Sequence, residues 1–87
     1  MNAMLTEFMG TFFFLYVILA TGNFLAIGAA LALAIYIGGP ISGGNFNPAV
    51  TIMMITAKKQ KMDTALPYIV AQIAGGLVAL ALYKQIN

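Results

Sequence analysis

The residues of this 87-residue chain that can interact with a passing molecule are concentrated in one polar stretch, Ile41–Thr51. Its sequence is ISGGNFNPAVT, and it lies inside a longer run, Phe8–Ala57, that contains no charged residue. The side-chain amide of Asn47 can donate a hydrogen bond, and the backbone carbonyls of Gly43–Asn45 can accept hydrogen bonds. Such donors and acceptors beside an apolar wall suit the single-file transfer of water or small neutral solutes.

The composition excludes most other kinds of chemistry. The chain contains no cysteine and no histidine, so it lacks thiol nucleophiles and the usual ligands of zinc. Its only acidic residues are Glu7 and Asp63, and no motif for nucleotides, phosphate or metals is present. Four lysines, three of them close together, are too few for a nucleic-acid-binding surface. We therefore predict no catalytic residue, no metal site, no cofactor and no nucleic-acid partner, and we do not expect an enzyme.

Two polar residues in apolar surroundings, Glu7 and Gln72, are open to more than one interpretation. Glu7 can be an interfacial residue in contact with water, a group that acts directly on a solute, or a support whose oxygens accept N–H groups from the polar stretch. We favour the support. Gln72 shares a helical face with Gly75 and Gly76, which predicts close helix packing and an inter-helix hydrogen bond that also helps to satisfy the backbone of the polar stretch.

The composition also assigns the chain to the membrane proteins. Hydrophobic residues make up 62% of the chain and charged residues 7%, and the mean hydropathy is +0.97. A soluble domain of this size exposes a large share of its surface and cannot hide so much apolar area. The first apolar segment follows Glu7 without any Lys or Arg, so we interpret it as a membrane span and not as a signal peptide. The expected fold class is an all-α integral membrane protein embedded in the lipid bilayer.

Breaks must divide the apolar sequence into separate helices. The first break is the turn-forming cluster Thr21-Gly22-Asn23, and the second begins at Gly38-Gly39-Pro40, where glycine and proline are expected to end a helix. We expect one membrane domain, residues 1–87, with spanning helices at about 5–21, 24–38 and 64–83, a loop at 39–47 and a short helix at 48–58.

The short helix at 48–58 cannot cross a bilayer. It would be about 15 Å long, whereas the hydrocarbon core is about 30 Å thick. Asn47 is a preferred N-cap, and Pro48 suits the first helical position. Lysines follow the other end of the helix, which places that end at the water surface and Asn47 near the bilayer midplane. The loop before it must then be re-entrant, with the positive end of the helix dipole at its tip, where it repels cations.

The lysines predict an orientation. Lys58, Lys59 and Lys61 lie between the short helix and the third span, whereas Lys84 lies at the end of that span. Positively charged residues are enriched in cytoplasmic loops. We therefore expect the N-terminus and the Lys58–Lys61 loop to be cytoplasmic.

Three segments resemble, in the correct order, the aquaporin and glycerol-facilitator family, the major intrinsic proteins. The polar stretch resembles the first NPA loop of the family, and Thr6–Thr11 resembles its first-helix signature. Tyr68–Gln72, followed by Gly75 and Gly76, resembles its third helix. The resemblance implies a channel for water or small neutral solutes such as glycerol. It also implies roles for individual residues: Asn47, Pro48 and Ala49 at the pore, the carbonyls of Gly43, Gly44 and Asn45 along it, and Glu7 and Gln72 as loop supports.

The resemblance is confined to the first of the two inverted repeats of that family. The sequence has no second NPA loop and no arginine, so the filter arginine of the family is missing. Ile27 falls at a filter position that is aromatic in many relatives, and Asn45 replaces a frequent histidine. One half cannot enclose a pore, so we predict completion by a second copy in inverted orientation or by a separate second half. The alternatives are a non-conducting membrane protein that associates with full-length channels, and a fragment.

Overall fold

The computed structural model describes residues 1–87 as four α-helices and one short 3-10 helix, without strands. Their limits are α1 Ala3–Thr21, α2 Phe24–Ser42, α3 Pro48–Thr56, η1 Met62–Thr64 and α4 Ala65–Ile86. The helices α1, α2 and the η1–α4 segment are long and apolar enough to cross a membrane. The predicted all-α membrane fold is therefore confirmed.

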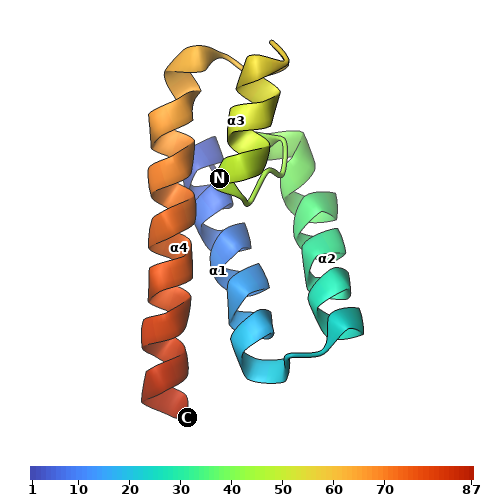
Figure 1. Cartoon of the computed structure of the whole chain (residues 1–87), viewed down its shortest axis with the longest axis vertical. Coiled ribbons are helices and arrows are strands. Elements are labelled where there is room, and N and C mark those ends of the chain that lie inside the picture. Colours follow the sequence, from blue (N-terminus) through green and yellow to red (C-terminus); the bar gives the residue numbers. More distant parts are fainter.

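The arrangement places the short helix α3 at one end of the molecule. Figure 1 shows α1, α2 and α4 running along the long axis, while the loop after α2 turns back into the molecule and α3 returns to the end at which α2 finishes. The molecule measures 40 × 23 × 23 Å, and its longest dimension is close to the thickness of a bilayer with its headgroups. With nine residues, α3 is about 14 Å long, which is about half the thickness of the hydrocarbon core of a bilayer.

Asparagine side chains begin three of the helices. The Oδ1 of Asn2 accepts the N–H of Leu5 at 2.8 Å at the start of α1. The hairpin between α1 and α2 combines Gly22, in the left-handed region with φ 57°, with Asn23, which caps α2. Asn47 caps α3, and Pro48 occupies its first turn. These caps satisfy N–H groups that have no partner within the helix.

The expected end of the second helix at residue 38 is wrong, because α2 continues through Pro40 to Ser42. Proline removes one helical hydrogen bond, but contacts from the other helices hold the last turn in place. The Ser42 hydroxyl donates to Glu7 at 2.7 Å, and the Tyr68 hydroxyl donates to the Ser42 carbonyl at 2.7 Å. The loop is therefore shorter than the expected 39–47 and consists of residues 43–47.

Two further boundaries differ from the expected ones. The short helix ends at Thr56 and not at residue 58, because Lys58 adopts a left-handed conformation with φ 60° and its N–H bonds to the Ile55 carbonyl. Thr64 does not cap the last helix with its side chain, since its hydroxyl donates to the Lys61 carbonyl at 2.6 Å. The 3-10 helix η1 precedes α4, which extends to Ile86 and beyond the expected residue 83.

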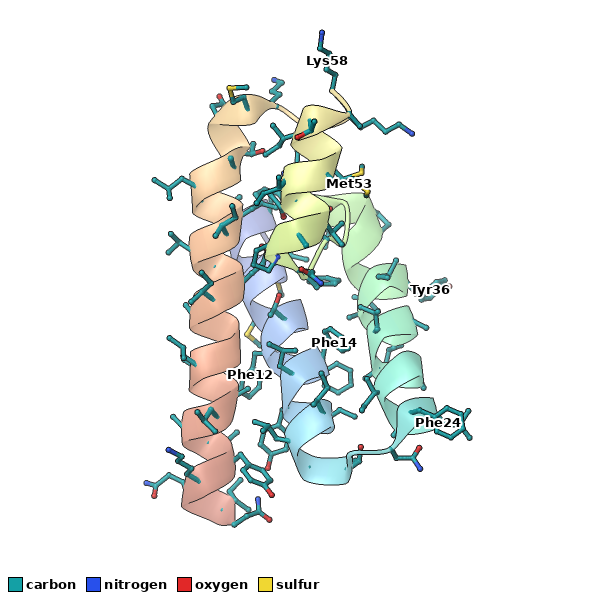
Figure 2. All side chains as sticks on the ribbon, in the orientation of Figure 1. Phe12, Phe14, Phe24, Tyr36, Met53 and Lys58 are labelled. Atoms are coloured by element: carbon teal, nitrogen blue, oxygen red, sulfur yellow. The ribbon has the colours of Figure 1, made fainter.

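Small residues bring α1 and α4 close together. A Cβ atom on Gly75 would lie 2.6 Å from the backbone oxygen of Phe8, and one on Gly76 would lie 2.8 Å from Leu15 Cδ1. Small side chains that allow backbones to approach are typical of helix packing in membranes. In contrast, Phe24 and Tyr36 project outward from α2, as Figure 2 shows, and are 80% and 81% exposed, which suits a surface in contact with lipid.

Candidate functional site

The loop between α2 and α3 is attached to α1 through the carboxyl group of Glu7. This side chain is fully buried and accepts four hydrogen bonds, two on each oxygen. Oε2 accepts from the Ser42 hydroxyl at 2.7 Å and the Asn45 N–H at 3.1 Å. Oε1 accepts from the Phe46 N–H at 2.8 Å and from the Gln72 amide at 2.7 Å. Burying a carboxylate in a membrane costs free energy unless its oxygens accept hydrogen bonds. Here two of the four donors are N–H groups of the loop backbone.

Gln72 contacts the loop indirectly. Its Nε2 donates to Glu7 and, at 2.8 Å, to the hydroxyl of Thr51 on α3, and it forms no hydrogen bond with the loop backbone. Thr51 also accepts a hydrogen bond from the Asn45 amide at 3.0 Å. The side chains of α1, the loop, α3 and α4 are thus joined in one buried network. The expectation that Gln72 satisfies loop backbone is wrong, because its amide N–H groups bond to the side chains of Glu7 and Thr51.

Phe46 anchors the loop by packing. Its side chain is 2% exposed, and its backbone lies in the left-handed region with φ 55°. Cβ atoms built on Gly10 and Gly38 would lie within 2.8 Å of its ring, so the ring fills the space that these two glycines leave between α1 and α2. The ring is thus in close contact with both helices.

The carbonyl groups of the loop residues Gly43–Asn45 have no hydrogen-bond partner within the chain. Gly43 and Gly44 adopt φ values of 92° and 66°, which glycine tolerates without steric cost. The N–H groups of Gly44, Asn45 and Phe46 all bond to side chains, whereas the carbonyl oxygens of Gly43–Asn45 accept no hydrogen bond from the chain. These backbone donors are therefore satisfied within the protein and the acceptors are not, with Gly43 exposed and Gly44 and Asn45 buried.

Asn47 forms the exposed tip of the loop. Its Oδ1 accepts the Ala49 N–H at 2.8 Å, while its Nδ2 has no partner within the chain. Pro48 is half-buried and Ala49 is exposed beside it. The N-terminus of α3 lies at the same tip and carries roughly half a positive charge. The tip thus combines a free hydrogen-bond donor with a positive end of a helix dipole.

A groove of about 510 Å³ lies beside this tip, between α1 and α4. Most of its lining is apolar, but Asn47, Pro48, Thr11 and Gln72 contribute to it. Two residues of this lining each hold one buried polar atom without a hydrogen-bond partner, Thr11 Oγ1 and Gln72 Oε1. Unpaired buried polar atoms are rare in membrane interiors because each one costs free energy.

Ile27 lies away from this network. It occupies the first turn of α2, where its N–H bonds to the Asn23 carbonyl at 2.9 Å, and its side chain is half-buried. About 22 Å of helix separates it from Ser42, where the loop begins. The structure thus brings Glu7, Asn45 and Gln72 together and leaves Ile27 near the opposite end of α2.

Several residues that hold the loop were not predicted from the sequence. They are Ser42, Phe46, Thr51 and Tyr68, all of them buried. The hydroxyl groups in apolar surroundings were a usable signal, because a buried hydroxyl must find a partner. Phe46 carried no such signal, because the two glycines that accommodate its ring come from different helices.

The chain matches a known family over its whole length. A family model described as Major intrinsic protein matches residues 1–87. The glycerol uptake facilitator protein-like 6 of Lactiplantibacillus plantarum is 45% identical over 97% of this chain and 43% of the relative. The probable aquaporin PIP2-6 of Oryza sativa subsp. japonica is 34% identical over 98% of this chain and 37% of the relative.

A third relative gives the same result over a shorter region. Aquaporin Z of Photorhabdus laumondii subsp. laumondii is 43% identical over 69% of this chain and 26% of its own length. No solved structure matches the chain significantly. The chain spans less than half of the length of these relatives. The family match over residues 1–87 is nevertheless complete, and the chain therefore belongs to the major intrinsic protein family.

Proposed function

We propose that this chain is one half of a passive pore for water or small neutral solutes such as glycerol. The observation that carries the proposal is the exposed tip of the re-entrant loop, where the Asn47 amide is free and α3 begins. A dipolar solute can accept a hydrogen bond from Asn47 and donate to the carbonyls of Gly43, Gly44 and Asn45. The positive helix terminus opposes cations at the same point. The printed names of the relatives, a glycerol uptake facilitator and aquaporins, support the same class of solute.

In this proposal the network around Glu7 holds the tip and takes no part in conduction. Glu7 fixes the loop backbone, and Gln72 fixes Glu7. Pro48 and Ala49 complete the tip beside Asn47. Ile27 is proposed as a filter position from the resemblance alone.

The pore must be completed by a second half. A single tip leaves the exposed Asn47 amide and the exposed Gly43 backbone facing the hydrocarbon, which costs several kcal/mol for each unpaired group. The groove between α1 and α4, which Asn47 helps to line, is the surface that a second half would cover. A second copy in inverted orientation and a separate second half both meet this need.

We also propose that the N-terminus and the Lys58–Lys61 loop face the cytoplasm. Three lysines lie on that side and Lys84 lies on the other. One orientation favours a separate partner, whereas a homodimer of inverted copies requires both. Cysteine labelling in sealed vesicles distinguishes one orientation from two. One cysteine is introduced at Lys59 and another at the C-terminus. If each site is labelled partly from outside the vesicle and partly from inside, the result supports the inverted homodimer.

Osmotic swelling of proteoliposomes tests conduction. We expect the purified oligomer to raise water or glycerol flux above that of empty vesicles. If a verified oligomer gives no flux, the half-pore proposal is wrong. Co-purification with a full-length channel, combined with absent flux, would instead support a non-conducting partner of such channels.

A further inference from the structure

The loop between α3 and α4 concentrates positive charge at one end of the molecule. Lys58, Lys59 and Lys61 are all exposed there. The chain has only two acidic residues, and Glu7 is buried among its four hydrogen-bond donors. Asp63 is thus the only acidic side chain near the loop, so three positive charges face one negative charge.

The backbone of this loop is held in a fixed conformation. Lys58 adopts a left-handed conformation, and the N–H groups of Lys58 and Lys59 bond to the last carbonyls of α3 at 3.0 and 2.9 Å. Gln60 accepts a hydrogen bond from the Asn45 amide at 2.8 Å and donates to the Thr64 hydroxyl at 2.9 Å. The lysine side chains therefore extend from a backbone that is anchored to the rest of the fold. Figure 2 shows Lys58 projecting from this end of the molecule, away from the helices.

The lysines surround a hollow of about 400 Å³. Its lining combines charged and amide groups with apolar side chains, namely Lys58, Lys59, Gln60, Lys61, Ile55 and Met62. Met62 is 79% exposed, which places an apolar side chain directly beside the cationic groups. A ligand that carries a negative charge next to an apolar chain would satisfy both kinds of surface.

The position of the loop in a membrane points to the same ligand. The loop joins α3 to the η1–α4 segment, which is one of the three segments able to cross the bilayer. Its lysines consequently lie at the level of the lipid headgroups, where basic residues next to a span attract anionic lipids.

We propose that the Lys58–Lys61 loop and Met62 bind an anionic phospholipid, with the lysines on the headgroup phosphate and Met62 beside the upper part of an acyl chain. Each lysine near the membrane surface is worth about a fivefold increase in affinity for an anionic surface. The site does not depend on conduction, so it stands or falls separately from the pore.

Native mass spectrometry of the full chain in a neutral detergent tests the proposal. Titration with phosphatidylglycerol is compared with titration with phosphatidylcholine for the wild-type chain, the triple variant Lys58→Gln, Lys59→Gln, Lys61→Gln, and the control variant Lys84→Gln. We expect the wild-type chain and the control to prefer phosphatidylglycerol by about tenfold or more, and the triple variant to lose most of this preference. Circular dichroism checks that the helix content of each variant is unchanged.

A second variant and a competitor keep the test decisive if the triple variant fails to fold. Asp63→Asn removes the one negative charge near the loop and should strengthen phosphatidylglycerol binding by up to about fivefold. The proposal is overturned if the wild-type chain shows no preference, or if a folded triple variant or Asp63→Asn binds as the wild type does. Displacement of the lipid by millimolar inorganic phosphate would assign the site to a free anion and would likewise overturn the lipid proposal.

Discussion

The carboxyl group of Glu7 and the side-chain amide of Gln72 lie 2.7 Å apart, although 65 positions separate them in the sequence. This contact joins α1 to α4 at the level at which the loop tip enters the molecule. Glu7 continues the link to the loop backbone, and Gln72 continues it to Thr51 on α3. Four elements that are far apart in the sequence thus share one buried set of hydrogen bonds.

The first prediction concerns the charge of Glu7. The substitution Glu7→Gln keeps the shape of the side chain but replaces one carboxylate oxygen with an NH₂ group. That group then faces two hydrogen-bond donors and cannot accept from them. We expect the free energy of unfolding in detergent to fall by about 2–4 kcal/mol, because hydrogen bonds to charged groups contribute roughly 1.5–3 kcal/mol and two donors lose their acceptor. The control is Asp63→Asn, at an exposed carboxylate, where the change should stay within about 0.5 kcal/mol. Equal stability of the two variants would contradict the role of Glu7.

The second prediction concerns the space that Gly10 leaves for the ring of Phe46. A Cβ atom at Gly10 would overlap the ring, and one at Gly38 would lie 2.8 Å from it, so the ring must shift to accommodate an added methyl group. We expect Gly10→Ala to destabilise the protein by about 1–3 kcal/mol, as overpacking does in cores. The matched control is Gly28→Ala on α2, where nothing lies within 4 Å, and there the better helix propensity of alanine should stabilise by up to about 1 kcal/mol. Thermal unfolding in detergent measures both variants, and the same sign for the two would refute the contact.

The third prediction concerns the hydroxyl group of Tyr68. It donates to the Ser42 carbonyl at 2.7 Å and so caps the end of α2 beyond Pro40. Tyr68→Phe removes this single bond and should cost about 1 kcal/mol, with faster amide hydrogen exchange in the last turn of α2. Tyr36→Phe is the control, because that side chain is 81% exposed and should show neither effect. Unchanged exchange in Tyr68→Phe would mean that α2 holds its last turn without the cap.

The fourth prediction concerns the charge at the loop tip. Asn47→Asp retains a good N-cap, so the helix should remain stable. The substitution removes the free amide donor and adds a negative charge that opposes the positive helix terminus. In proteoliposomes that contain the completed pore, we expect lower water flux and a cation leak about tenfold higher or more. That factor is about 1.4 kcal/mol, well within the roughly 4 kcal/mol between two unit charges 4 Å apart at an effective dielectric constant of 20.

Asn87→Asp is the control for the fourth prediction. It adds the same charge at an exposed position beyond α4. Flux and leak should equal those of the wild-type protein. If Asn47→Asp also leaves both unchanged, then Asn47 does not line the path of the solute.

Local chemistry made much of the fold predictable. The Gly22-Asn23 turn, the cap at Asn47 and Pro48, and the three apolar segments each depend on neighbouring residues, and the observed helices begin and end close to them. The end of α2 was mispredicted for the opposite reason. Glycine and proline at positions 38–40 favour a break locally, but Glu7 and Tyr68, on α1 and α4, stabilise one more turn.

The sequence by itself determined the class of the protein, the number of its α-helices and the position of the loop tip. It also determined the helix lengths to within a few residues. Those properties follow from hydropathy and from capping, which act over short distances along the chain. Only the tertiary structure decided that Gln72 holds Glu7 instead of the loop, that Phe46 fits between Gly10 and Gly38, and that Thr51 and Tyr68 complete the network. These relationships depend on how three helices approach one another, and close approach is set by side chains that meet only after the chain has folded.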